Sequence, residues 1–270
     1  SGPVLTRPAA SSRNLILFGP ALKLPKAQES LDNPVWSFCL VPLMLLLPNR
    51  LTLLQRVQGA ATNGFTHYTT GQVSPTRWPA LCAKFASSYE TNLSKSTRSR
   101  RRQAGEAVSL LYGCEPPPYD PAAPIFWVLV STEGKGRVHA REQLRQFASQ
   151  RIEIDGYELV HDGVSWSWRL TQKRYRYWRD QIHSIAAKAP DRRLIGTDQD
   201  GAYDVEIERV MGSIYNMPGF RLARRQAGHL VAFAKAEWRR LRPESGPQIR
   251  VRTFLPYVQR LPNQRPEKGR

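Results

Sequence analysis

Short apolar runs in the first half of the chain predict buried strands. Residues 14–20 (NLILFGP), 35–48 and 125–131 (IFWVLVS) are rich in aliphatic and aromatic side chains. Runs of this length are typical of strands covered on both faces. Residues 64–73 combine Thr and aromatic side chains between glycines, which fits either a strand or a structured loop.

Later segments of the chain predict further strands. Residues 165–170 alternate between Trp or Leu and Ser or Arg, so they predict a strand with one apolar and one polar face. Residues 157–163 predict another strand just before it. Residues 248–254 are consistent with a last strand that carries Arg250 and Arg252 on one face.

Apolar residues at intervals of three and four positions predict helices elsewhere. Residues 49–61 have this pattern. In residues 74–90, Ser74 is a suitable N-cap and Pro75 suits the first turn. The remaining predicted helices cover residues 139–148, 171–188, 203–214 and 219–241.

The segment of residues 92–113 changes character halfway. Its first half is basic without any acid, and its second half has apolar residues at helical spacing. We expect one helix, starting near Ser94 or Ser96, whose first turns project as a finger because they offer no apolar face for packing. Positive charge near a helix N-terminus opposes the helix dipole, which favours a role in binding. The expected nucleic-acid-binding cations are Lys95, Arg98, Arg100, Arg101 and Arg102.

Residues 114–124 are rich in Pro and predict a boundary between two parts. We expect an N-terminal α+β part over residues 1–113, which includes the finger at about 92–113. We expect a C-terminal α+β part with basic helices and a tail over residues 125–270.

The net charge restricts the class of binding partner more than any other property of the sequence. The 270 residues include 40 Lys and Arg against 22 Asp and Glu, a net charge of +18. Such an excess favours a polyanion as partner, with nucleic acid first and an anionic membrane surface second. Arg outnumbers Lys, and its planar fork binds phosphates and stacks on bases, so nucleic acid is favoured and no membrane partner is expected.

Cysteine usage and hydropathy indicate a cytoplasmic protein. Cys39, Cys82 and Cys114 stand far apart and form no CxxC pair, so neither a zinc finger nor a disulfide framework is indicated. The apolar stretch 35–48 is too short to span a bilayer, and Pro42 interrupts it.

Two predicted helices offer further basic surfaces, each with two interpretations. In residues 219–241 a basic stripe lies beside an apolar one, and it is either solvated or follows a phosphate backbone. In residues 169–180 Arg alternates with aromatic residues, which fits base stacking or a helix with an aromatic core face. The candidate binding residues are Arg174, Arg176, Arg221, Arg225, Lys235 and Arg239.

Catalytic residue types are sparse. The sequence contains no HExxH, GxSxG or paired-carboxylate pattern. His67 lies in a polar segment between glycines and is suited to proton transfer, although a structural histidine is the commoner outcome. The acids of residues 198–208 flank a Gly turn and look like a helix start, so we expect no metal and no cofactor.

Three segments carry a resemblance to a known family: SKSTRSRRRQAGEA (94–107), GFTHYTTG (64–71) and YELVHDGVSWSWRLT (157–171). The chain resembles the RAMP-superfamily CRISPR RNA-processing endoribonucleases, most specifically the type IV, plasmid-borne kind. The resemblance implies an α+β fold with a RAMP/ferredoxin-like sheet core, a projecting Arg-rich finger and a helical C-terminal part.

The same resemblance implies an activity in antiviral defence. Such an enzyme cuts CRISPR repeat RNA at a hairpin without a metal, leaves a 2′,3′-cyclic phosphate, and stays on the crRNA with other effector subunits. His67 is then the expected proton-transfer residue, and Arg50 and Arg242 the expected phosphate stabilisers. The alternative is a non-enzymatic DNA-binding protein of a plasmid or integrative element, such as a replication or partition factor. RNA preference separates the two, because only the cleavage reaction needs the 2′-hydroxyl.

Overall fold

The computed structural model describes residues 46–263 except 190, 200, 243–246, 248 and 253. These described residues all belong to one compact unit. The strand expected at residues 14–20 and most of the apolar stretch 35–48 lie outside the described residues. The end of that stretch forms the short strand β1 (Leu46–Leu47).

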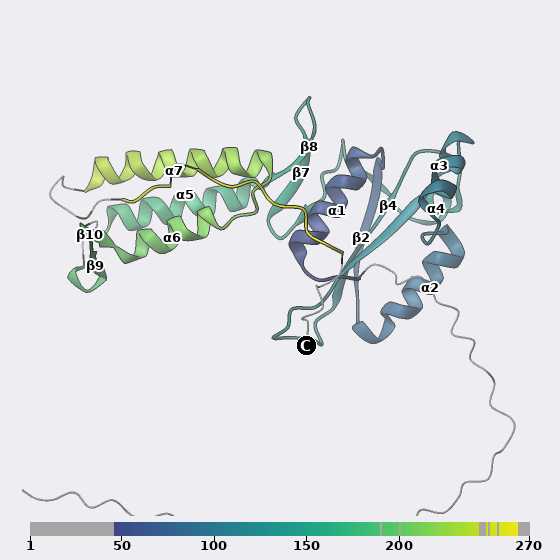
Figure 1. The fold of residues 1–270 in the computed structure, drawn as a ribbon, viewed down its shortest axis with the longest axis horizontal. Coiled ribbons are helices and arrows are strands. Elements are labelled where there is room, and N and C mark those ends of the chain that lie inside the picture. The colour runs from purple at the N-terminus through teal and green to yellow at the C-terminus, as the bar shows by residue number, and fades with distance from the viewer. Residues whose placement is uncertain are drawn as a thin grey trace, which may run out of the picture. The chain divides into compact units, whose positions relative to one another are not determined.

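The main sheet has five strands in the order β1-β3-β4-β2-β5 (Figure 1). β1 pairs with β3 in parallel, and all other pairs are antiparallel. Along the chain, four of these strands and two helices follow one another as β2-α2-β3-β4-α4-β5, and α3 lies between α2 and β3. The new bounds are β2 (His67–Val73), α2 (Trp78–Tyr89), α3 (Lys95–Gln103), β3 (Ser109–Cys114), β4 (Ile125–Ser131), α4 (Arg137–Arg141) and β5 (Arg145–Gln146).

Helices cover both faces of this sheet. α1 (Arg50–Thr62) packs on one face, while α2 and α4 pack on the other. Side chains of β4 alternate between the two cores: Val128 and Val130 join the α1 side, and Ile125 and Leu129 join the α2 side. Burial on both faces explains the uninterrupted apolar run in this strand.

The expected long finger helix is wrong in its second half. α3 ends at Gln103, Gly105 takes a φ of +78°, and the chain then forms β3 between β1 and β4. Tyr112 faces α1 and Leu111 faces α2, which is the two-residue period of a strand. The first half matches the expectation, since α3 has no buried residue.

Residues 114–124 connect two strands of one sheet. β3 and β4 pair antiparallel along the whole of β3, from Ser109 with Ser131 to Cys114 with Phe126. The Pro-rich segment therefore runs between neighbouring strands of the main sheet, and the expected parts 1–113 and 125–270 share that sheet.

A second sheet joins the main sheet to three helices. β6 (Glu153–Ile154), β7 (Tyr157–His161) and β8 (Trp166–Leu170) form an antiparallel sheet, and the two expected strands are confirmed. Trp168 is fully buried and donates from Nε1 to the Leu54 carbonyl of α1 at 2.8 Å. This contact fixes β8 onto α1.

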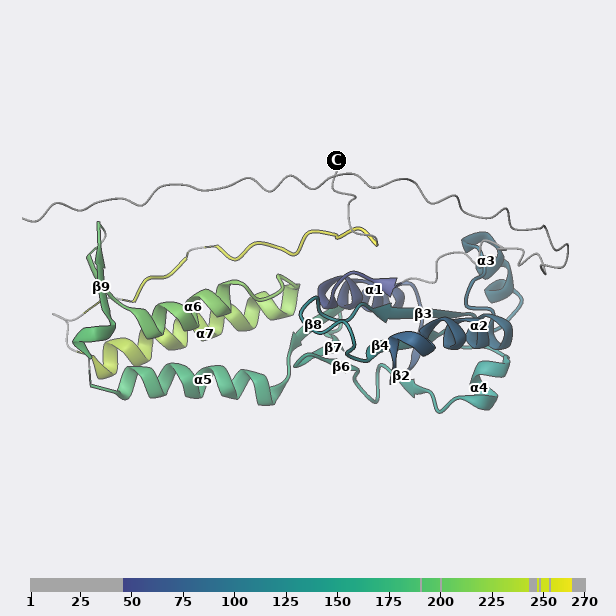
Figure 2. The same cartoon turned by 90° about the horizontal axis from the view of Figure 1, so that it is seen from below.

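The three long helices that follow pack against one another (Figure 2). They are α5 (Gln172–Ala187), α6 (Val205–Tyr215) and α7 (Arg221–Leu241), as their apolar periodicity predicts. A short hairpin of β9 (Ile195–Asp198) and β10 (Gly201–Asp204) precedes α6. Asp204 is the N-cap of α6 and accepts from the backbone N–H groups of Glu206 and Ile207, so the acids here do mark a helix start.

The last described segment is extended but joins no sheet. Residues 249–252 and 254, where a strand was expected, belong to no strand. The segment runs past α6 and α7 and reaches α1 (Figure 2). Side chains replace a strand partner: the Arg252 N–H donates to the Tyr215 hydroxyl at 2.9 Å, and the Arg252 guanidinium lies 5.1 Å from the Tyr215 ring centroid.

Candidate nucleic-acid interface

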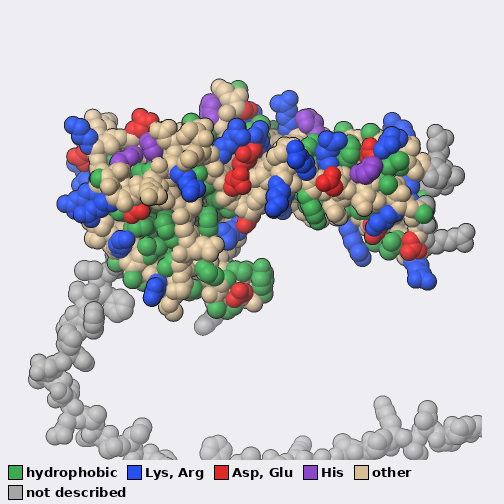
Figure 3. Space-filling view, turned by 180° about the vertical axis from the view of Figure 1, so that it is seen from behind, with side chains coloured by type: hydrophobic (Ala, Val, Ile, Leu, Met, Phe, Trp, Pro, Cys, Tyr) green, Lys and Arg blue, Asp and Glu red, His purple; other side chains and the backbone are tan. Residues whose placement is uncertain are grey.

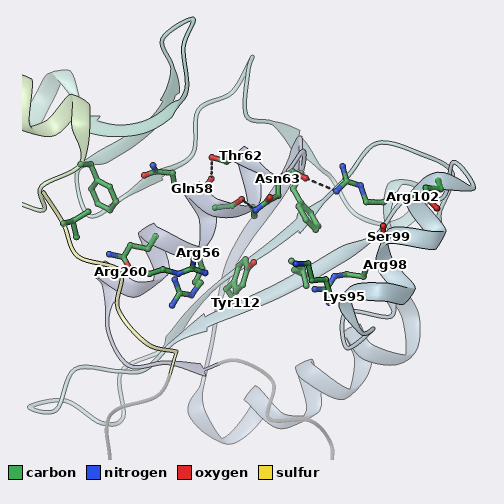
Figure 4. A pocket seen from close by; sticks show the side chains of 18 residues that line it. Arg56, Gln58, Thr62, Asn63, Lys95, Arg98, Ser99, Arg102, Tyr112 and Arg260 are labelled. Atoms are coloured by element: carbon green, nitrogen blue, oxygen red, sulfur yellow. Dashed lines mark hydrogen bonds between the residues drawn. The ribbon is translucent and has the colours of Figure 1, made fainter.

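A basic groove of about 930 Å³ lies between α1, α3 and the C-terminal segment (Figure 4). Phe65 and the β3 residues Leu110 and Tyr112 also line it. Five cations contribute to its walls, and no acidic side chain of the described residues does. These groove cations are Arg56 from α1, Lys95, Arg98 and Arg102 from α3, and Arg260 from the C-terminal segment.

The helical spacing of the α3 cations explains why only some of them line the groove. Ser94 caps α3 by accepting from the Thr97 N–H at 3.2 Å. Positions 95, 98 and 102 are three and four residues apart, so they share one face of the helix. Arg101 points elsewhere and forms ion pairs with Glu90 and Glu106.

Neutral partners hold three of the groove guanidiniums in place. Arg102 donates to the Asn63 carbonyl at 2.9 Å, and Arg98 donates to the Leu93 carbonyl. Arg56 donates to the Asn263 side chain at 2.5 Å and to the Leu261 carbonyl. None of the five groove cations forms an ion pair with a described acid. A guanidinium has five N–H donors, so these contacts leave several donors for a ligand.

The groove is electrostatically unbalanced without an anion. Burial, and then the charge of Arg260, lower the pKa of Arg56, while Tyr112 opposes this shift. Burial raises the pKa of Tyr112 to about 12 against the nearby Arg98 and Arg56, so Tyr112 stays a neutral hydroxyl. On the face shown in Figure 3, by contrast, Lys and Arg are interspersed with Asp and Glu. The groove therefore concentrates positive charge that a phosphate would neutralise.

His67 lies on the other side of the sheet from the groove. It begins β2, and its neighbour Tyr68 packs into the core under α1, so alternation turns His67 toward α4. Its ring centroid is 4.8 Å from that of His139, in an edge-to-face contact. Its Nδ1 lies 2.9 Å from the Thr66 hydroxyl, and its Nε2 lies 3.3 Å from the Gln146 amide nitrogen.

The surroundings of His67 favour the neutral imidazole. Burial, and then the charge of His139, lower the pKa of His67, and Glu133 opposes this shift. The His139 Nε2 lies 2.8 Å from the Thr132 carbonyl, which makes that nitrogen a donor. His67 at the start of β2 and His139 on α4 lie side by side, and such a pair is suited to accept and donate protons in turn.

Arg50 and Arg242 do not join His67. Arg50 begins α1, lies 3.6 Å from Asp155 and stacks on the Phe126 ring. Arg242 is only 8% exposed, donates to the Ile185 carbonyl at 2.8 Å and lies 3.5 Å from the Asp204 carboxylate. The expected catalytic trio is therefore not assembled, and burial closes Arg242 to a substrate phosphate.

The other expected binding residues lie outside the groove. Arg174 donates to the Asp155 carbonyl at 2.5 Å, and Arg221 pairs with Asp162 at 2.7 Å. The apolar stripe of α7 is buried, as expected. The basic stripe beside it is exposed, and its choice between solvent and phosphate stays open. The exposed cations outside the groove include Arg100, Arg176, Arg225, Lys235 and Arg239.

Two groove cations were missed in the sequence. Arg56 belongs to a helix whose apolar face alone was informative, and Arg260 lies in what looked like a tail. The signal for both is a long-range contact: Gln55 donates to the Gln259 carbonyl at 2.6 Å and accepts from the Leu261 N–H at 2.9 Å. No short stretch of the sequence predicts this contact.

Within the described part of the chain, no three His, Cys, Asp or Glu side chains are grouped to hold a metal ion. No helix in that part is long and apolar enough to cross a membrane. The chain matches no family model, no curated protein and no solved structure at a significant level. Arguments about function therefore rest on the geometry above.

Proposed function

We propose that the protein binds the phosphate backbone of a structured RNA in the basic groove. The observation that carries this proposal is a groove lined by five cations from three segments, with no acid among its described residues. Phosphates supply most of the affinity in such interfaces and fix the register of the nucleic acid. Fixed guanidiniums at spaced positions suit a stem whose phosphates are also fixed.

The order of strands and helices along the chain supports the finer proposal of a RAMP-type protein. A ferredoxin-like unit has the element order β-α-β-β-α-β, and β2-α2-β3-β4-α4-β5 follows it. α2 and α4 share one face of the sheet, and the basic α3 is an insertion after α2. The proposed function is therefore that of a CRISPR RNA-processing endoribonuclease, which holds a repeat hairpin and stays with it in an effector complex.

The proposed cleavage needs no metal. The ribose 2′-oxygen attacks the adjacent phosphorus and loses its proton to a base, while the bond to the 5′-oxygen breaks and that oxygen takes a proton from an acid. The products are a 2′,3′-cyclic phosphate and a 5′-hydroxyl. Guanidiniums of the groove are suited to stabilise the dianionic phosphorane. At a phosphate held in the groove both protons exchange with water, because His67 lies on the other side of the sheet. His67, with His139 beside it, transfers them only if the scissile phosphate lies on that side.

The second candidate is the non-enzymatic DNA-binding protein. One observation favours it: no histidine is among the described residues that line the groove. A DNA-binding protein needs only the cations, whereas a ribonuclease gains from a group that titrates near neutral pH.

Incubation with a CRISPR repeat RNA in EDTA tests the proposal. We expect one discrete cut with a cyclic-phosphate end. An RNA with a single 2′-deoxy nucleotide at the cut site should bind equally and stay intact. His67→Ala should slow cleavage about 10²–10⁴-fold with little loss of affinity if it transfers the proton. Binding without cleavage, equally tight to duplex DNA, would replace the ribonuclease with the DNA-binding protein.

A further inference from the structure

The C-terminal segment exposes two aromatic rings on an anchored backbone. Phe254 and Tyr257 are 63% and 61% exposed. Their neighbours Leu255 and Val258 pack against the main core. The segment therefore turns two aliphatic side chains inward and two aromatic rings outward.

Contacts on both sides hold this backbone in place. Arg224 of α7 donates from Nε to the Leu255 carbonyl at 2.6 Å, and the Val258 N–H donates to the Gly219 carbonyl at 3.1 Å. A Cβ on Gly219 would lie 2.1 Å from the Pro256 carbonyl oxygen, so only glycine allows this approach.

Arg224 stacks on the two rings but does not bury them. Its guanidinium carbon lies 3.6 Å from the Tyr257 ring centroid and 5.3 Å from that of Phe254. One guanidinium stacks on one face of a ring, and more than half of each side chain stays open to solvent. Aromatic rings backed by Arg are the usual platform for unpaired bases.

The ring pair continues directly into the basic groove. Val258 follows Tyr257 and lines the groove, and Arg260 is one of the groove cations. An extended chain advances about 3.3 Å per residue, so the rings lie within roughly one or two nucleotides of the groove.

We infer that Phe254 and Tyr257 stack unpaired nucleotides that flank the RNA stem held in the groove. This inference rests on the proposed function and adds to it a second contact, with bases of a single-stranded flank rather than with phosphates. Stacking tolerates any base, so the flank adds affinity without strict sequence preference.

The test compares a blunt RNA hairpin with the same hairpin carrying a short unpaired pyrimidine flank at either end. We expect one flank to tighten binding to the full chain. Phe254→Ala and Tyr257→Ala should each remove about 5- to 150-fold of that gain, and neither should change affinity for the blunt hairpin. Tyr257→Phe should keep the gain. Tyr119→Ala, which removes an 89% exposed ring outside the groove, is the matched control.

An abasic flank identifies the contact. It keeps the phosphates but offers no base, so it should lose the gain in the natural chain and lose nothing more in the ring variants. A flank that adds nothing, or a gain that survives both ring substitutions, overturns the inference and leaves the groove proposal standing. Failure of the blunt hairpin to bind overturns the groove proposal. In that case a flank alone that binds and depends on both rings still supports the stacking surface.

Discussion

His67 is the one expected catalytic residue whose surroundings suit proton transfer. Because burial and His139 lower its pKa from 6.5, we expect an NMR titration of the His67 ring to show a midpoint below 6.5. His139→Gln removes the neighbouring charge and should raise the midpoint, while burial keeps it under 6.5. Glu133→Gln should lower it, since Glu133 opposes the shift.

The lowered pKa of His67 also determines how the free energy of unfolding changes with pH. The unfolded chain binds a proton at His67 near pH 6.5, and the folded chain does so only at lower pH. The free energy of unfolding should therefore decline as the pH falls below 6.5 and level off below the folded pKa. His67→Asn should weaken this part of the decline. A titration midpoint above 6.5 in the natural chain would contradict the geometry of the pair.

The contacts of Arg242 give it a structural role rather than the expected catalytic one. It is buried where α7 ends, between Ile185 and Asp204, and its guanidinium lies 4.7 Å from the Trp238 ring centroid. Arg242→Ala should lower the free energy of unfolding by about 3 kcal/mol, because Asp204 loses its buried partner. Chemical denaturation measures this loss. Arg239→Ala, an exposed position in the last turn of the same helix, should stay within about 0.5 kcal/mol.

α3 provides three of the groove cations and nothing to the core. Replacing Lys95, Arg98 and Arg102 together with Ala should weaken RNA binding and reduce the slope of log affinity against log salt by roughly 0.7–0.9 for each phosphate that the protein no longer neutralises. The melting temperature should change little, because no residue of α3 is buried. Binding assays across a salt series measure the slope.

Arg100→Ala is the matched control within α3. It removes an exposed cation from the same helix without touching the groove. If the groove binds the RNA, this variant should keep both affinity and slope close to those of the natural chain. An equal loss of log affinity per charge removed, in the control and in the groove variant, would mean that net charge, rather than the groove, governs binding.

Local periodicity predicted most helices and several strands, and it failed where two periods fit the same residues. Leu111 fits a helix beside Val108, but the same residues also fit a strand in which Leu110, Tyr112 and Cys114 face α1 and Leu111 faces α2. Pairing with β1 and β4 decides for the strand, because it buries both faces and satisfies the backbone hydrogen bonds. A short window around β3 contains neither β1 nor β4, so local periodicity alone does not reveal these partners.

At the scale of the whole molecule, the groove depends on contacts that the sequence does not show. Gln55 and Gln259 are 204 positions apart, yet the Gln55 amide pairs with the C-terminal backbone as another strand would. Net charge predicted a polyanion, and helical spacing predicted the basic face of α3. The partner wall with Arg56 and Arg260 emerges only when the C-terminal segment folds back onto α1.

The arrangement of the groove predicts a preference for a preformed stem. Its cations sit at fixed positions, since backbone carbonyls hold Arg98 and Arg102 and the helix spaces them at about 1.5 Å per residue. A flexible strand must lose conformational freedom to match such an array, whereas a stem already holds its phosphates in register. We therefore expect tighter binding to an RNA hairpin than to the same sequence with a disrupted stem. Compensatory changes that restore pairing with other bases should recover most of the affinity, because phosphates rather than base edges are contacted. A competition assay with the native, broken and restored hairpins measures this, and duplex DNA of the same sequence is the fourth arm. Equal affinity for all three RNAs would reject the stem as the ligand, and equally tight binding of the DNA would favour the DNA-binding candidate.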